Sequence, residues 1–161
     1  MVIKSIPRIN TPRRLTILGS TGSVGQNTVK LIQNEPDRYK VEILTANTNV
    51  ELLAQQANET GARLAVVTDE TKYEFLKSLL KNSKTEVAAG FSALLDAAST
   101  PVDWVMAAIV GAAGLKPTMA AIRNSSVVAL ANKECLVCAG EVMLTEIDKS
   151  KSKVLPVDSE H

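Results

Sequence analysis

A short apolar segment that ends abruptly in a run of glycines constrains the fold of this chain more than any other feature. Residues 15–26 read LTILGSTGSVGQ, so a β-like run meets glycines at positions 19, 22 and 25. From residue 23 onward, apolar positions recur at helical spacing, and one face is expected to carry Val24, Thr28, Val29, Leu31 and Ile32. A strand, a glycine turn and a helix N-terminus are typical of a phosphate site, because the free N–H groups of the helix end bind anions.

Two interpretations of this glycine loop, residues 19–25, stay open. Its Gly-x-x-Gly-x-x-Gly spacing departs from the Gly-x-Gly-x-x-Gly of dinucleotide-binding folds, and glycines alone are a weak signal. The alternative is a tight turn without a ligand, since glycine is the usual residue in such turns. A P-loop NTPase is disfavoured, because no Gly-Lys-Ser/Thr closes the loop.

The composition argues against several classes of function. A chain of 161 residues can form one domain with a substantial core. Its net charge of +1 creates no field for nucleic acid or an anionic membrane, and 3% aromatic residues offer few surfaces for stacking bases. No apolar run is long enough to span a bilayer. The two cysteines, Cys135 and Cys138, are compatible with a reducing compartment, so we expect a cytoplasmic location.

Strand-like and helix-like patterns alternate along most of the chain. Residues 1–14 are expected to be a flexible N-terminal arm, and residues 15–161 a single domain. Strands are expected at 15–19, 40–46, 63–68, 85–88, 102–108, 127–131 and 153–157. Helices are expected at 23–34, 50–60, 70–82, 91–98, 114–124 and 134–150, with Asp69 capping the third and Pro117 in the first turn of the fifth. This alternation predicts an α/β fold: a Rossmann-like, doubly wound, mostly parallel sheet with helices on both faces.

Polar or glycine-rich clusters follow five of the expected strands. They are residues 19–25, 47–49, 110–114, 132–134 and 158–160. The carboxyl ends of parallel strands meet at one edge of the sheet, and ligands bind at that edge. The third and fourth strands are expected to lead only into ordinary capping residues. We therefore expect one ligand site, built from the other strand ends.

Two of these clusters suggest how a dinucleotide could be held. No Asp or Glu occurs from Leu44 to Val50, where an NAD site usually places one, so Asn47-Thr48-Asn49 favours NADP. A loop of turn-forming asparagines is the alternative. The small residues 110–114 could let a ring or ribose lie against the backbone, or could simply let a helix pack closely on the sheet.

The remaining clusters contain candidate substrate and metal groups. Lys133 could bind a phosphate or a substrate oxygen, although an ordinary helix start with Glu134 in its first turn would look the same. Asp158 and Glu160 would point to one side of an extended segment and suit Mg²⁺ or Mn²⁺, with a solvated acidic tail as the alternative. Cys135 and Cys138 lack a second pair, so we interpret them as packed helix cysteines.

Four stretches together resemble the 1-deoxy-D-xylulose 5-phosphate reductoisomerase family. They are LTILGSTGSVG (15–25), VMAAIVGAAGL (105–115), LANKE (130–134) and LPVDSEH (155–161). The resemblance implies an N-terminal NADPH-binding domain of an oxidoreductase that makes 2-C-methyl-D-erythritol 4-phosphate for isoprenoid biosynthesis, with Mn or Mg. It implies NADPH contacts at Thr21, Gly22, Ser23, Val24, Asn49, Asn132 and Glu134. It also implies sugar-phosphate contacts at Lys133 and Ser159, and metal ligands at Asp158 and Glu160.

The chain also departs from the family pattern. Many members have Gly-Lys where Asn47-Thr48 stands, so no cofactor contact is assigned to these two residues. The family continues into catalytic and C-terminal domains that are absent from this chain, so we expect the fragment alone to be inactive and the full-length protein to be a homodimer. The alternative is a stand-alone NADP-binding module without catalysis.

Overall fold

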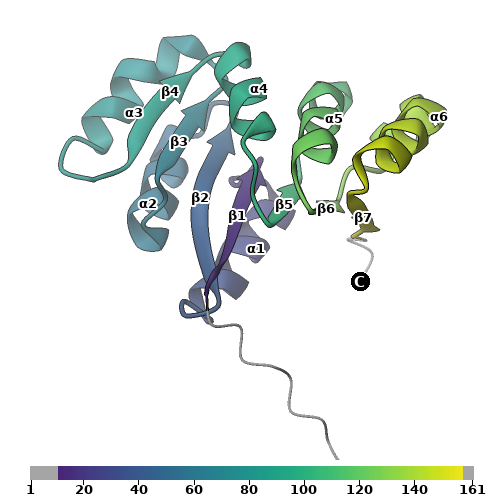
Figure 1. Ribbon diagram of the computed structural model, residues 1–161. Helices are drawn as coiled ribbons and strands as arrows, with labels where there is room; N and C mark the ends of the chain where they lie inside the picture. Colours follow the sequence, from purple (N-terminus) through teal and green to yellow (C-terminus); the bar gives the residue numbers. More distant parts are fainter. Residues whose placement is uncertain (1–10, 158–161) are drawn as a thin grey trace, which may run out of the picture.

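The computed structural model describes residues 11–157, which form a single sheet flanked by helices (Figure 1). The strands are β1 (Arg13–Leu18), β2 (Tyr39–Ala46), β3 (Leu64–Val67), β4 (Glu86–Ala89), β5 (Trp104–Ala107), β6 (Val127–Leu130) and β7 (Lys153–Pro156). The helices are α1 (Ser23–Gln33), α2 (Val50–Thr60), α3 (Tyr73–Leu79), α4 (Phe91–Ser99), α5 (Leu115–Asn124) and α6 (Lys133–Ser150). Two 3₁₀ turns, η1 (Glu70–Lys72) and η2 (Ala112–Gly114), precede α3 and α5.

The sheet has the strand order β4-β3-β2-β1-β5-β6-β7, and every neighbouring pair is parallel. From β1 the chain builds outward to β4, then returns to the centre and builds outward from β5 in the other direction. The strand order therefore reverses between β1 and β5, which is where a doubly wound sheet opens a crevice for ligands. The predicted Rossmann-like fold with helices on both faces is confirmed.

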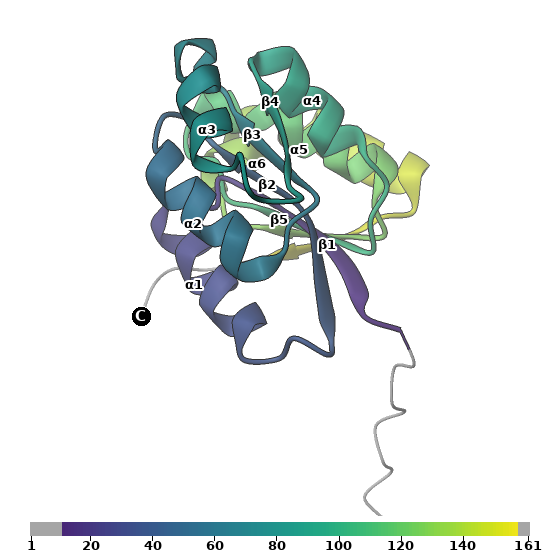
Figure 2. The ribbon, with the colours of Figure 1, turned by 90° about the vertical axis from the view of Figure 1, so that its left-hand side faces the viewer.

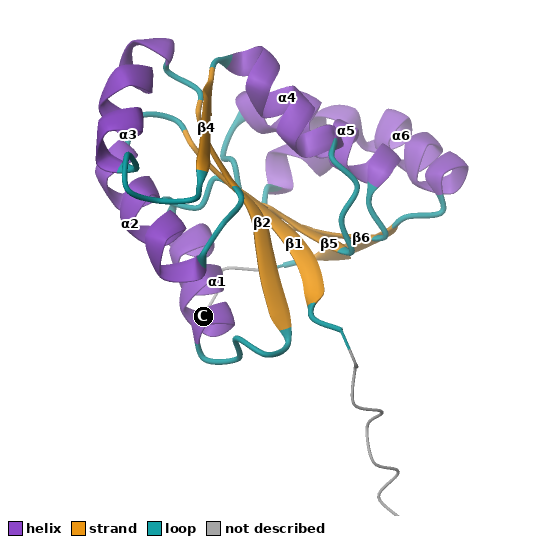
Figure 3. Ribbon diagram, turned by 60° about the vertical axis from the view of Figure 1, so that its left-hand side comes forward, coloured by secondary structure: helices purple, strands orange, loops and turns teal. Residues whose placement is uncertain are grey.

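Two helical layers cover the sheet, α1 to α3 on one face and α4 to α6 on the other (Figure 2 and Figure 3). The central strands are buried on both sides, so their apolar runs are continuous. Ile17 and Leu44 pack in the core under α1–α3, whereas Ile43 and Val105 pack in the core under α4–α6. These two cores hold the strand ends rigidly, and the loops that leave them are positioned accordingly.

Charged residues extend the first strand beyond its expected start. Arg13 and Arg14 pair in register with Tyr39 and Lys40 of β2, so β1 begins inside the segment expected to be an arm. The register shifts by one residue between Leu15 and Thr16, a β-bulge next to the buried β2 residue Glu42. A strand predicted from its apolar residues starts at Leu15 and therefore misses this pairing, because the two arginines are charged.

Most local predictions hold at the helices. Asp69 caps η1 ahead of α3, and Pro117 lies in the first turn of α5. The expectation for Leu31 is wrong: this side chain is 69% exposed, because the buried face of α1 consists of Gly25, Thr28, Val29 and Ile32. Among residues 11–157, no helix is long and apolar enough to cross a membrane.

Candidate cofactor-binding site

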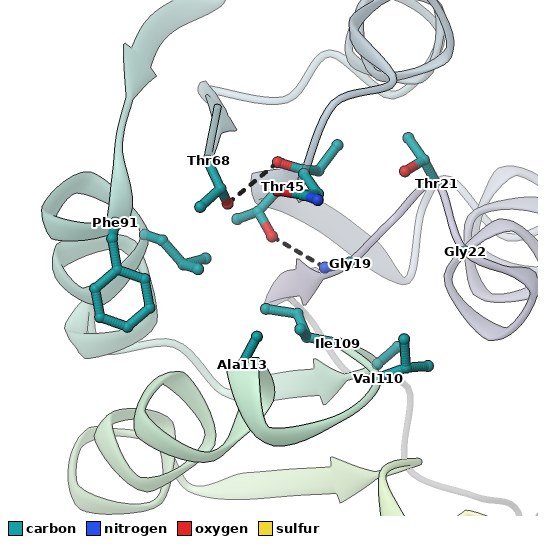
Figure 4. Close-up of a pocket in the computed structure, with 13 residues that line it drawn as sticks. Gly19, Thr21, Gly22, Thr45, Thr68, Phe91, Ile109, Val110 and Ala113 are labelled. Carbon is teal, nitrogen blue, oxygen red and sulfur yellow. Dashed lines mark hydrogen bonds between the residues drawn. The ribbon is translucent and has the colours of Figure 1, made fainter. Parts of the chain in front are cut away.

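The clusters that follow β1, β2 and β5 come together at the carboxyl edge of the sheet, as predicted. They border a cleft of about 270 Å³ at the point where the strand order reverses (Figure 4). Its lining residues are Gly19, Thr21, Gly22, Thr45, Ala46, Asn47, Thr68, Phe91, Leu94, Ala108, Ile109, Val110 and Ala113. They include no charged side chain, so most of the cleft presents apolar groups and backbone.

Close backbone approach explains two glycines of the loop. Gly19 has φ +81°, and a Cβ there would lie 2.9 Å from the carbonyl oxygen of Ala108 at the end of β5. A Cβ on Gly25 would lie 2.2 Å from the carbonyl oxygen of Gly19, inside the loop itself. Only glycine fits at either position, so the loop folds tightly onto β5 and brings the start of α1 to the cleft.

The carbonyl groups of the loop are all engaged within the protein. Gly19 O accepts a hydrogen bond from the Gly22 N–H (3.3 Å), and Gly22 O accepts one from the Gln26 N–H (2.8 Å). The side-chain amide of Gln26 donates to Thr21 O (2.8 Å), and that of Gln56 donates to Ser20 O (2.9 Å). Each of these four carbonyl oxygens therefore already accepts a hydrogen bond from within the protein.

The N–H groups of the same loop are mostly unpaired. Those of Thr21, Ser23 and Val24 have no acceptor among residues 11–157, and no side chain caps α1. Unpaired N–H groups at a helix N-terminus, where the helix dipole is positive, form an anion site. With its carbonyls bonded within the protein and the N–H groups of Thr21, Ser23 and Val24 lacking an acceptor among residues 11–157, the loop fits the pyrophosphate of a dinucleotide.

The loop after β2 starts helix α2. Its three polar residues are exposed, and only Asn47 lines the cleft. The side chain of Asn49 accepts a hydrogen bond from Leu52 N–H (3.1 Å), so this residue is the N-cap of α2. The amide oxygen of Asn49 is thus already used. The expected NADPH contact would have to come from the rest of its side chain or from the backbone beside the helix N-terminus.

Asn132 joins the loop after β5 to the start of α6. Its amide nitrogen donates to the carbonyl oxygens of Ile109 (2.8 Å) and Gly111 (2.9 Å). Its amide oxygen accepts from the N–H groups of Glu134 (2.9 Å) and Cys135 (3.3 Å). All the hydrogen-bonding groups of this buried side chain are used. Asn132 thus holds two loops of the site in fixed relation.

The next residues sit in the first turn of α6. Lys133 and Glu134 are exposed, and a carboxylate oxygen of Glu134 lies 3.5 Å from where a Cβ on Gly111 would be. Glu134 therefore faces the loop after β5. Cys135 is buried, and burial raises the pKa of its thiol despite a hydrogen bond with Thr118.

Some expectations about the site are corrected or lie beyond the described residues. Cys138 is exposed, so the expectation that both cysteines are packed is wrong for this one, which lies on the outer side of α6. Asp158, Ser159 and Glu160 lie outside residues 11–157. Within that range, no group of three or more His, Cys, Asp or Glu side chains could hold a metal.

Sequence reasoning missed part of the cleft. Thr45, inside β2, accepts a hydrogen bond from the Gly19 N–H with its hydroxyl (2.9 Å; Figure 4). Thr68 follows β3, and Phe91 begins α4 directly after the loop from β4; both line the cleft. The prediction that the third and fourth strands lead only into capping residues is therefore wrong. A polar residue next to the carboxyl end of a strand, as at Thr45 in β2, was the one available signal.

The comparisons with known proteins agree with this geometry. The family model for 1-deoxy-D-xylulose 5-phosphate reductoisomerase matches residues 15–140. This chain belongs to that family. The reductoisomerase of Rhodospirillum centenum is 52% identical over 165 aligned positions, which cover 100% of this chain and 41% of that protein. The chain thus spans about 40% of the length of this relative.

Solved reductoisomerase structures share the fold. The structure of the Zymomonas mobilis reductoisomerase in complex with NADPH has a TM-score of 0.90 and 51% identity, and covers 94% of this chain and 40% of that one. A reductoisomerase structure with NADPH, fosmidomycin and magnesium has a TM-score of 0.84 and 36% identity, covering 89% of this chain and 36% of that one. A homoserine dehydrogenase at 19% identity and TM-score 0.51 shows the fold alone.

Proposed function

We propose that this chain is the NADPH-binding part of a 1-deoxy-D-xylulose 5-phosphate reductoisomerase. The whole enzyme would be an oxidoreductase that converts 1-deoxy-D-xylulose 5-phosphate to 2-C-methyl-D-erythritol 4-phosphate with NADPH and Mn or Mg. The observation that carries the proposal is the loop at residues 19–25. Its carbonyls are engaged, and its N–H groups at Thr21, Ser23 and Val24 have no acceptor within the described part of the chain. The family membership and the NADPH complex of the Zymomonas mobilis relative support it.

The proposed roles follow the edges of the cleft. The backbone of residues 21–24 binds the pyrophosphate, and Asn49 lies at the adenosine side, beside the N-terminus of α2. Asn132 and Glu134 support the cofactor from the opposite side of the strand-order reversal. When bound, NADPH supplies the hydride for the reduction. This division would let one rigid edge hold both ends of the dinucleotide.

The substrate and metal groups of the proposal lie after β6 and β7. Lys133, at the start of α6, would bind the sugar phosphate together with Ser159. Asp158 and Glu160 would be two ligands of the divalent metal, which acts as a Lewis acid toward substrate oxygens when bound. Two hard carboxylate ligands suit Mg²⁺ or Mn²⁺, so the donor set matches the proposed ions.

Cofactor titration tests this proposal. We expect the 161-residue chain to bind NADPH saturably, with weaker binding of NADH, measured by nicotinamide fluorescence. The Thr48→Lys variant adds a cation beside the proposed 2′-phosphate, and we expect it to strengthen NADPH binding about fivefold with no gain for NADH. Equal binding of both cofactors would contradict the NADP assignment. No binding of either would contradict the cofactor role of the chain.

We also propose a cytoplasmic location and a homodimeric full-length protein. The two free cysteines support a reducing compartment. Sedimentation of the full-length protein would test the dimer: a mass twice that of the monomer is expected, and a monomeric mass would contradict it.

A further inference from the structure

We propose that Gln56 is a positioning residue for the pyrophosphate site, acting through the carbonyl group of Ser20. This inference rests on the proposed function and adds a residue from outside the glycine loop. Gln56 belongs to α2 and is 3% exposed, a degree of burial that glutamine rarely reaches. Its amide nitrogen donates to Ser20 O over 2.9 Å, across a separation of 36 residues in the chain.

The geometry of a peptide unit explains how this bond acts on the ligand site. The C=O of Ser20 and the N–H of Thr21 belong to one planar trans peptide and point in opposite directions. Because Gln56 holds the carbonyl beneath the loop, the Thr21 N–H is turned to the opposite side, where it has no acceptor among residues 11–157. A carbonyl rotated the other way would place a negative dipole against the anion.

Ser20 is held from its other side as well. Its N–H donates to Thr45 O at 2.8 Å, so β2 fixes one peptide of this residue while α2 fixes the next. In the same manner, the side-chain amide of Gln26 donates a hydrogen bond to Thr21 O at 2.8 Å. Two glutamines from two different helices therefore keep consecutive loop carbonyls away from the cleft. Of these two bonds, only the one from Gln56 reaches the loop from a separate element.

Unpaired atoms show that Gln56 is not simply a well-satisfied core residue. Its amide oxygen and the hydroxyl of Ser20 are both buried without a hydrogen-bond partner among the described residues. A buried amide that is only half satisfied destabilises a core relative to an apolar side chain of the same shape. Its presence here is explained by the one hydrogen bond it does make, to the loop.

Substitution of Gln56 by methionine separates this role from simple packing. Gln56→Met keeps the length of the side chain and removes the donor together with the unpaired oxygen. Gln55→Met is the matched control: Gln55 is the exposed neighbour, bonded to Glu59 rather than to the loop. NADPH and adenosine 2′-monophosphate are titrated into each 161-residue chain, since the second probe lacks the pyrophosphate, and melting temperatures are recorded.

We expect Gln56→Met to weaken NADPH binding about tenfold while the affinity for adenosine 2′-monophosphate changes less than about twofold. Gln55→Met should change neither. The inference would be overturned if Gln56→Met bound NADPH as tightly as the wild-type chain, or if its affinities for both probes fell by the same factor. If Gln56→Met does not fold, Gln56→Asn takes its place, because the asparagine amide is one methylene too short to reach Ser20 O. The same result is expected of it: weaker NADPH binding and nearly unchanged binding of adenosine 2′-monophosphate. Failure of the wild-type chain to bind NADPH would contradict the proposed function itself, and the inference with it.

Discussion

Two asparagines begin helices at the carboxyl edge of the sheet, and they make different hydrogen bonds there. Among the described residues, Asn49 bonds only through its amide oxygen, as the cap of α2, whereas Asn132 also donates two hydrogen bonds to the loop after β5. Aspartate caps a helix as well as asparagine does, but it has no N–H groups to donate. Substituting each asparagine by aspartate therefore keeps the helix cap in both cases and removes the hydrogen bonds to the neighbouring loop only at Asn132.

We predict that Asn132→Asp lowers the free energy of unfolding by about 1–3 kcal/mol, because a buried carboxylate would face two carbonyl oxygens. Asn49→Asp is the control and should stay within about 0.5 kcal/mol of the wild-type chain. Urea unfolding of both variants measures the difference. Equal stability of the two variants would show that the bonds from Asn132 to Ile109 and Gly111 contribute nothing.

Two glycines on helices offer a second matched pair. A methyl group on Gly25 would collide with backbone atoms of Gly19 and Ser20, which cannot move without opening the loop. A methyl group on Gly140 of α6 would meet no atom within 4 Å among the described residues beyond its chain neighbours and the backbone of its own helix turn. We predict that Gly25→Ala costs about 1–3 kcal/mol of stability and abolishes NADPH binding. Gly140→Ala should be neutral or stabilising by up to about 1 kcal/mol. Wild-type NADPH affinity in Gly25→Ala would refute the tight loop.

At the scale of elements, a buried carboxylate joins the amino-terminal ends of three strands. Glu42 of β2 contacts Arg14 of β1 (3.1 Å), Lys40 of its own strand (3.4 Å) and Arg63, just before β3 (3.3 Å). Burial by itself raises the pKa of this carboxyl, but hydrogen bonds and charge from Arg14 and Lys40 outweigh it, and the net pKa lies below the ordinary value. The charged form therefore stabilises the fold.

The stabilisation from Glu42 should depend on pH. With a folded-state pKa below the unfolded one, it is present above the unfolded pKa of about 4.3 and is lost as the pH falls through the folded value. We predict that Glu42→Gln lowers stability at pH 7 by about 1–2 kcal/mol and flattens the loss of stability in acid. Glu86→Gln, which removes the 70% exposed partner of Arg63, should do neither. Parallel acid-unfolding curves for wild type and Glu42→Gln would contradict this account.

The elements themselves could largely be predicted from local pattern. Apolar runs and helical spacing marked every strand and helix between Arg13 and Pro156, because a doubly wound sheet buries its strands on both faces. The failures, in contrast, arise from tertiary neighbours. Arg13 joins β1 through its backbone, and Leu31 faces solvent from α1 although its spacing suited the core. Neither fact is visible without knowing which strand or helix lies alongside.

At the scale of the whole molecule, strand order decides which residues reach the cleft. The order β4-β3-β2-β1 brings Thr68 and Phe91 to the same cleft as the glycine loop. No local pattern specifies that order, so these two residues could not be assigned from the sequence. The donors and acceptors of the loop likewise depend on Gln56, which is distant in sequence from Ser20. The glycine motif and the helix start predict a phosphate site here, and that stays a prediction. Tertiary contacts, such as the one from Gln56 to Ser20 O, determine which carbonyl groups of the loop are hydrogen-bonded within the protein.

Backbone amide NMR of the 161-residue chain during an NADPH titration tests the central claim most directly. The account predicts that the largest shifts occur at the N–H groups of Thr21, Ser23 and Val24, with further shifts at the loops after β2 and β5 and none at the opposite edge of the sheet. Saturable shifts confined to other parts of the chain, or no shifts at millimolar NADPH, would contradict the assignment of this edge as the cofactor site.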